Sequence, residues 1–173
     1  MSDESAIDAA VRPAVTGEEP WLVLPPALAI PPGAGAICDE AGARRIGRGA
    51  AEAAFTTAPV MVAHASLTAR RLGLAPPPRA VDLLDVLELF AFVRPARFCA
   101  PSPSGLALAL GMVEPKGAEA QAVALRHAAD ALLRELADPA WPRREDAMTL
   151  NETLSKAGWG WGWRVSGALQ HQP

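Results

Sequence analysis

Short apolar runs separated by turn residues fill the first part of the chain. From Trp21 to about residue 49 the runs are broken by Pro-Pro, Gly-Ala-Gly and Glu-Ala-Gly, which is typical of short strands joined by turns. We expect two or three antiparallel strands there. The run PVMVAHA begins at Pro59 and is apolar without alternation, so it predicts a strand that is buried on both faces.

Helical patterns lie on both sides of that buried strand. The stretch AAEAAFTT, after Gly49, is helix-prone, and the helix after the strand should end at Gly73, a residue suited to a C-cap. Further along, VDLLDVLELFAFV predicts a nearly engulfed helix. Within it, Asp82, Asp85 and Glu88 recur every three residues and form one narrow acidic stripe.

The second half of the chain is expected to be helical. The segment PSPSGLALALG predicts a short helix closed by Gly111, and residues 118–137 predict one long amphipathic helix. The apolar side of the long helix consists of Ala122, Leu125, Ala129, Leu132, Leu133 and Leu136. A last helix should run from about Ala147 to Lys156, after which the chain ends in GWGWGWRVSGALQHQP.

Composition indicates one soluble domain. Half of the 173 residues are hydrophobic, which is enough for a single sizeable core, and the net charge of −3 argues against a surface that binds nucleic acid throughout. No apolar run approaches the roughly 20 residues of a membrane span, and the start MSDESAIDAA lacks the pattern of a secretory signal. We therefore expect a cytoplasmic protein in which Cys38 and Cys99 are free, buried thiols.

Several motifs for chemistry are incomplete. The nucleotide-hydrolase phosphate loop is absent, and the Gly-Ala-Gly at 33–35 and the Gly-Arg-Gly at 47–49 lack the third glycine of a dinucleotide fingerprint. We interpret both as turn glycines. The cysteines and histidines have no zinc-ligand spacing. His64 ends the buried strand, so we expect a hydrogen-bonded histidine at the edge of the core and not a member of a Ser-His-Asp site.

The acidic stripe has two readings. Clustered carboxylates can hold magnesium or manganese in a two-metal nuclease site. That reading also needs carboxylates from other strands, and these supply almost none. A solvated helix face explains the stripe with fewer assumptions. A residual nuclease would have to use Asp82, Asp85 and Asp130.

Arginines and tryptophans are the candidate contacts to nucleic acid. The C-terminal tryptophans alternate with glycines, so an extended segment would turn all three rings to one side, where they could stack on single-stranded bases. We favour a hydrophobic strip that docks onto this domain or a neighbour. The arginines could contact phosphate, although scattered surface arginines suit the acidic balance better. The candidates are Arg44, Arg45, Arg48, Arg70, Arg71, Trp159, Trp161 and Trp163.

Four segments resemble a known family. They are ARRIGRG, PVMVAHASLTARRLG, VDLLDVLELFAFVRPARFCAPSPSGLALALG and HAADALLRELADPAWP. In this order they resemble the N-terminal region of bacterial, particularly alphaproteobacterial, ATP-dependent DNA helicases of the DinG type, over most of residues 27–165. In that family the region resembles a DEDD exonuclease of the RNase H-like class. The resemblance implies a helicase motor that follows it and binds ATP and magnesium.

The catalytic motifs of the family are broken here. Neither ALAI nor GAIC offers the Asp-x-Glu of the first strand, and HASLTA, from His64, places Ala69 where His-Asn-x-x-Phe-Asp has its metal-binding aspartate. Asp82 matches the aspartate of the Asp-Thr-Leu element, a structural position in that pattern. The third motif, His-x-Ala-x-x-Asp, is echoed by His127 and Asp130 with the wrong spacing.

We therefore expect a degenerate, non-catalytic exonuclease-like domain. Its fold would be α/β, with an RNase H-like core and a small mixed sheet, followed by a mostly helical C-terminal half. The expected divisions are a flexible arm at 1–20, the exonuclease-like domain at 21–138, and a helical extension with a Trp-rich tail at 139–173.

The expected role is to position the motor or to guide single-stranded DNA. The domain would hold no cofactor of its own. Its partners would be the motor in the same polypeptide and, as a further candidate, single-stranded DNA, with no membrane. A residual metal-dependent 3'-5' exonuclease and a protein–protein interaction module remain as alternatives.

Overall fold

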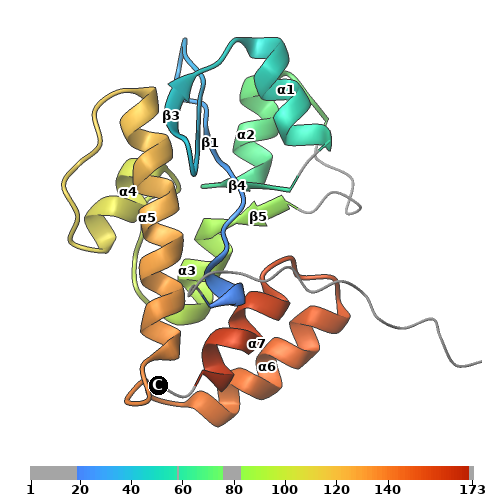
Figure 1. The fold of residues 1–173 in the computed structure, drawn as a ribbon, viewed down its shortest axis with the longest axis vertical. Coiled ribbons are helices and arrows are strands. Elements are labelled where there is room, and N and C mark those ends of the chain that lie inside the picture. The colour runs from blue at the N-terminus through green and yellow to red at the C-terminus, as the bar shows by residue number, and fades with distance from the viewer. Residues whose placement is uncertain (1–18, 58, 76–82, 172–173) are drawn as a thin grey trace, which may run out of the picture.

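A computed structural model of the chain describes residues 19–57, 59–75 and 83–171, which form a mixed sheet surrounded by helices (Figure 1). The strands are β1 (Ala27–Ala29), β2 (Ala36–Asp39), β3 (Gly42–Arg45), β4 (Val60–Val62) and β5 (Leu83–Asp85). The helices are η1 (Pro20–Leu22), α1 (Arg48–Thr57), α2 (Ala65–Leu72), α3 (Val86–Val93), α4 (Pro103–Ala109), α5 (Ala118–Ala137), α6 (Arg144–Lys156) and α7 (Gly162–Gln170). The predicted α/β class is confirmed. The predicted arm lies almost entirely outside the described residues.

The sheet has the order β3-β2-β1-β4-β5. Strand β2 pairs antiparallel with both β1 and β3, whereas β4 is parallel to β1 and β5 is parallel to β4. Only β2 therefore runs against the other four strands. The expected antiparallel strands after Trp21 and the strand after Pro59 are confirmed. The chain leaves β1 toward β2 on one side and returns to β4 on the other.

Side chains on the two faces of the sheet enter two separate cores. Met61 belongs to the core that contains α5, whereas its neighbours Val60 and Val62 belong to the core that contains Phe55 of α1. Alternate residues of a strand point to opposite faces, so β4 is buried from both sides as the sequence predicts. Helices α1 and α2 thus cover one face, and α5 covers the other (Figure 1).

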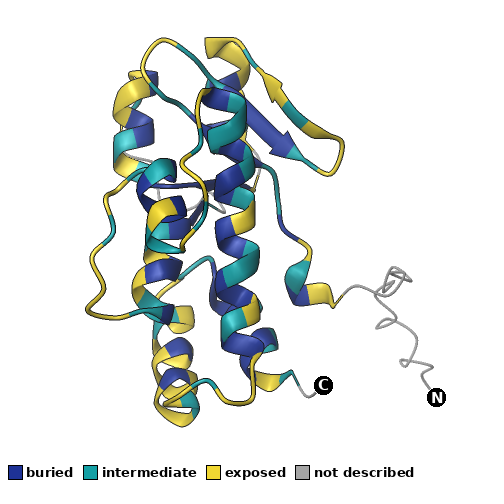
Figure 2. Cartoon of the chain, turned by 90° about the vertical axis from the view of Figure 1, so that its left-hand side faces the viewer, coloured by how far each residue is buried: buried dark blue, intermediate teal, exposed yellow. Residues whose placement is uncertain are grey.

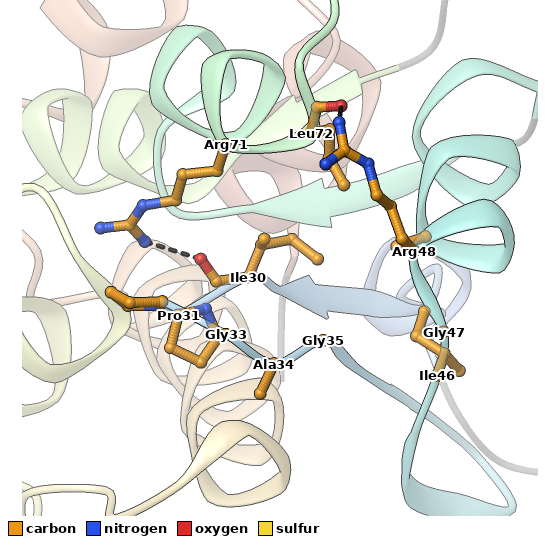
Figure 3. A pocket seen from close by; sticks show the side chains of 12 residues that line it. Ile30, Pro31, Gly33, Ala34, Gly35, Ile46, Gly47, Arg48, Arg71 and Leu72 are labelled. Atoms are coloured by element: carbon orange, nitrogen blue, oxygen red, sulfur yellow. Dashed lines mark hydrogen bonds between the residues drawn. The ribbon is translucent and has the colours of Figure 1, made fainter.

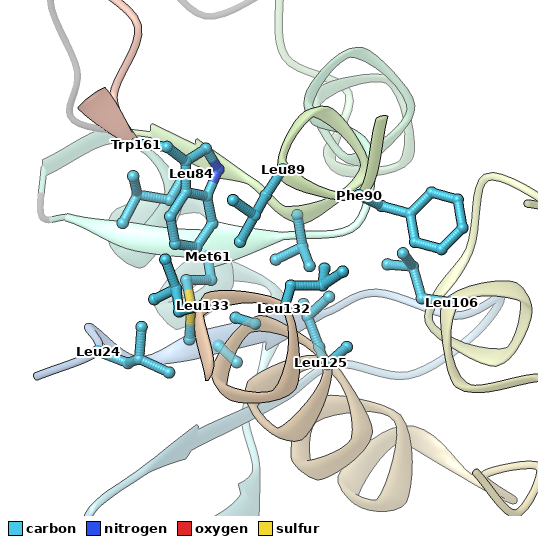
Figure 4. Close-up of a cluster of buried hydrophobic side chains, with 14 of the residues drawn as sticks. Leu24, Met61, Leu84, Leu89, Phe90, Leu106, Leu125, Leu132, Leu133 and Trp161 are labelled. Carbon is cyan, nitrogen blue, oxygen red and sulfur yellow. The ribbon is translucent and has the colours of Figure 1, made fainter. Parts of the chain in front are cut away.

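The larger core forms along α5. The helix has the predicted bounds, and its predicted apolar positions are all buried against β1, β2, α3, α4 and α7 (Figure 4). Strand β1 presents Ala27 and Ala29 to this core. Small side chains let a helix approach the sheet closely, which compensates for the scarcity of large aromatic residues. The other side of α5 carries the charged residues, and buried and exposed positions alternate along the helices (Figure 2).

Two helix boundaries differ from the sequence prediction. The helix expected over VDLLDVLELFAFV begins only at Val86, because Leu83–Asp85 forms strand β5 beside β4. Helix α6 begins at Arg144, ahead of the expected Ala147. The expected ends at Gly73 and Gly111 are confirmed, since both glycines adopt the left-handed conformation, with φ of 72° and 75°.

The last helix, α7, is an element that the sequence did not predict. It packs against α5, α6 and η1. Gly167 makes this packing close, because a Cβ atom there would lie 2.7 Å from Cβ of Trp21. Among the described residues, no helix is both long and apolar enough to cross a membrane. Cys38 is free and buried as expected, whereas Cys99 is free and only half-buried.

Candidate functional site

The two arginines of β3 are engaged in ion pairs on the edge of the sheet. Arg44 donates to Oδ2 of Asp39 at 2.6 Å, and Arg45 donates to Oε1 of Glu119 at 2.7 Å. The hydrogen bond from Arg44 lowers the pKa of Asp39. Both arginines therefore have a carboxylate beside them, which reduces their attraction for a phosphate.

The three C-terminal tryptophans do not form a common strip. Trp161 is fully buried, and its Nε1 donates to the backbone oxygen of Asp85 at 2.7 Å. Trp159 is half-buried, and its Nε1 donates to Oε2 of Glu88 at 3.1 Å. Trp163 is 54% exposed, with the guanidinium of Arg164 over its ring. The segment is not extended, because the chain turns at Gly158 and then starts α7. Trp159 and Trp161 dock onto this domain, as we favoured, but not as one strip.

Arg48 and Arg71 lie at one cavity of about 430 Å³, which we call the arginine cavity (Figure 3). It opens between the turn that follows β1, the start of α1 and the end of α2. The lining residues are Ile30, Pro31, Pro32, Gly33, Ala34, Gly35, Ile46, Gly47, Arg48, Ala51, Arg71 and Leu72. Arg70 is exposed on α2 and does not belong to this lining. The structure thus brings together two of the five candidate arginines.

Backbone carbonyls hold both arginines of the cavity in place. Nη2 of Arg48 donates to the oxygen of Leu72 at 2.6 Å, and Nη1 of Arg71 donates to the oxygen of Ile30 at 2.8 Å. Arg48 also donates to Glu52 at 2.7 Å. A guanidinium has five N–H donors, so each arginine keeps donors beyond these bonds. The two side chains lie on separate sides of the cavity (Figure 3).

The two glycine segments singled out in the sequence meet at this cavity. Gly33 has a φ of 76°, which fits the expected turn glycine. Gly35 is tight, since a Cβ there would lie 3.2 Å from the oxygen of Ile46. A Cβ on Gly47 would have no heavy atom within 4 Å. Gly33 therefore occupies a turn as expected, whereas the turn expected at 47–49 is wrong because α1 starts at Arg48 and contains Gly49.

The cavity lies where open α/β sheets commonly bind ligands. Its wall at 30–35 follows the carboxyl end of β1, and its wall at 46–48 follows the carboxyl end of β3. Crevices outside the carboxyl ends of strands are the usual ligand sites of these sheets. The position of the arginine cavity at the edge of the sheet and the charge of its two arginines thus both make it the candidate ligand site.

Asp85 has a structural role, and the solvated helix face expected for it is wrong. Its Oδ2 accepts from the backbone N–H of Ala65 at 2.7 Å and its Oδ1 accepts from that of Leu87 at 3.0 Å. The side chain is 9% exposed, and burial raises its pKa to about 6. Asp85 therefore caps α3 and joins it to the start of α2. Asp82 lies outside the described residues.

His64 is the capping residue of α2. Its Nδ1 accepts from the backbone N–H of Leu67 at 3.3 Å. This bond satisfies one of the N–H groups that a helix start leaves unpaired, so the expected hydrogen-bonded histidine at the edge of the core is confirmed.

The residues present do not fit a two-metal site of the exonuclease kind. Strand β1 offers only Ala27–Ala29, and Ala69 is buried in the core. Asp130 pairs with Arg134 at 2.8 Å on the surface of α5. Within the described ranges, no three His, Cys, Asp or Glu side chains gather in a way that could hold a metal ion.

Comparisons with protein-family models, with curated proteins and with solved structures found no match.

Proposed function

We propose that the chain is a non-catalytic, exonuclease-like domain of a DinG-type DNA helicase and guides single-stranded DNA toward the motor. The strand arrangement carries this proposal. The order β3-β2-β1-β4-β5, with β2 alone reversed and with α1, α2 and α3 after β3, β4 and β5, suits an RNase H-like core. The resemblance implies this order as far as α2, whereas β5 is an addition to it.

The loss of carboxylates supports a role without catalysis. Neither ALAI nor GAIC carries the first-strand carboxylates of such an exonuclease, and Ala69 stands where its second motif has an aspartate. Ala69 is only 1% exposed, so its surroundings are packed for a methyl group and not for a hydrated metal ligand. Both carboxylate oxygens of Asp85 accept hydrogen bonds from backbone N–H groups.

The arginine cavity supports binding of a polyanion. Its lining contains two arginines and no Asp or Glu. DNA offers phosphates, which arginine binds through charge-assisted hydrogen bonds. Because the whole chain is slightly acidic, attraction should be confined to this local site.

A titration of a fluorescent single-stranded oligonucleotide at low salt tests the proposal. Anisotropy and strand length are followed together, with and without manganese. We expect binding that weakens as salt rises, because phosphate contacts release counterions, and no shortening of the strand. Manganese-dependent shortening would restore the nuclease alternative. No binding at low salt would rule out the guiding role.

An interaction module built on the tryptophan strip has lost its main support. Trp159 and Trp161 are docked onto α3 and β5 of the same chain. Only Trp163 among the three is mostly exposed. A strip of three rings therefore does not face a partner.

A further inference from the structure

We infer that the arginine cavity binds the sugar–phosphate backbone of single-stranded DNA, with Arg48 and Arg71 contacting different phosphates. This inference rests on the proposed function and names the residues that receive the strand. The cavity of about 430 Å³ lies within the size range of roughly 300–1,000 Å³ that is usual for small-ligand sites, so it has room for one nucleotide unit.

The placement of the two arginines favours an extended anion. Each guanidinium is tied to a different carbonyl, Arg48 to Leu72 and Arg71 to Ile30, on separate sides of the cavity (Figure 3). A strand that crosses the cavity presents successive phosphates to both sides. These anchoring bonds also reduce the conformational entropy that the arginines lose on binding.

The rest of the cavity wall suits a sugar or a base but does not distinguish one base from another. Apart from the two arginines, all lining side chains are apolar or absent, with Ile30, Ile46 and Leu72 as the larger ones. Sequence is read by side chains that hydrogen-bond to base edges, and none of the lining side chains other than the two arginines, which we assign to phosphates, can do so. The cavity therefore binds strands of different sequence with similar affinity, as guiding a translocating strand requires.

Glu52 sets the balance of charge at one side of the cavity. It accepts from Nε of Arg48 at 2.7 Å but does not belong to the lining. The pair is largely exposed, so its carboxylate weakens the field of Arg48 only in part. Arg71 has no comparable carboxylate contact among the described residues, and its bond goes to a carbonyl. Arg71 is therefore expected to contribute the stronger phosphate contact.

Gly47 offers a direct test because a side chain there meets open space. We compare Gly47→Glu with Gly47→Gln, which have the same shape and differ in charge. At low salt the Glu variant should bind a fluorescent single strand about tenfold more weakly than the Gln variant, the loss expected for one charged contact.

Arg71→Gln gives an independent readout. Loss of one phosphate contact should reduce the slope of log K against log salt by about 0.7. The matched control is Arg45→Gln on β3, which lies outside the cavity and should leave the slope unchanged. Circular dichroism verifies that each variant is folded. If Arg71→Gln fails to fold, the comparison of Gly47→Glu with Gly47→Gln still tests whether DNA binds in the cavity.

The outcomes separate this inference from the proposed function. If the wild type binds no single strand, the proposed function fails and this inference falls with it. A second outcome is that the wild type binds DNA, the two Gly47 variants bind it with equal affinity, and Arg71→Gln has the salt dependence of the wild type. The DNA then binds elsewhere on the domain, and only the assignment to the cavity is overturned. A charge effect at Gly47 together with a smaller slope in Arg71→Gln supports it.

Discussion

At the scale of single residues, Asp85 joins three parts of the fold. Its carboxylate accepts hydrogen bonds from backbone N–H groups at the starts of α2 and α3, and its backbone carbonyl accepts one from the indole N–H of Trp161. These contacts explain why an acidic residue is buried at this position. Burial still penalises the charged form, which is why the pKa rises to about 6 from 3.8.

Asp85 should make stability depend on pH. Because its folded-state pKa is above its unfolded value, its stabilising contribution is full below about pH 4 and is lost as the pH rises through about 6. The loss should be on the order of 3 kcal/mol in the free energy of unfolding. Urea unfolding of the wild type and Asp85→Asn across this range isolates the effect. The wild type should lose stability relative to the variant as the pH rises; a constant difference would contradict the account.

The cavity illustrates what single residues cannot reveal. Arg48 and Arg71 looked like scattered surface arginines, since nothing in their local sequence separates them from Arg44 and Arg45. The difference arises from tertiary structure: α1 and α2 bring Arg48 and Arg71 to one cavity, whereas β3 places Arg44 and Arg45 outside it. A carboxylate contact alone does not separate them, because Arg48 also pairs with Glu52 at 2.7 Å.

At the scale of elements, long periodic patterns in the sequence were sufficient to predict a helix and its bounds, whereas short patterns were not. Helix α5 could be bounded from sequence because its apolar positions repeat over 20 residues. Strand β5 has three residues and exists because it pairs with β4, so its pattern merged with that of α3. Helix α7 was hidden by alternating glycines and tryptophans. It forms because Trp161, Val165 and Leu169 are buried in the core.

Two helical glycines should respond oppositely to alanine. In α7, Gly167→Ala would press a methyl group against Trp21, and such overpacking should cost about 1–3 kcal/mol. In α1, Gly49→Ala meets nothing within 4 Å and should stabilise by about 0.5–1 kcal/mol through helix propensity. Thermal unfolding of both variants compares them. A neutral Gly167→Ala would show that α7 does not pack tightly on η1.

At the scale of the whole molecule, the fold separates stability from the proposed binding. The larger core lies between the sheet and α5, whereas the arginine cavity opens beside the smaller core of α1 and α2. Single-stranded DNA could therefore occupy the cavity without disturbing α5. The α/β class followed from the order of strand and helix patterns, but the cavity is lined by separate segments and no local pattern predicts it.

Hydrogen exchange measured by mass spectrometry, with and without a single-stranded oligonucleotide, tests the central claim most directly. Bound DNA should slow exchange in the segments 30–35 and 46–51, which supply most of the cavity lining, and leave the exposed start of α7 near Trp163 unchanged. Protection confined to α7 and its surroundings, or none at a saturating DNA concentration, would contradict a domain that guides DNA through this cavity.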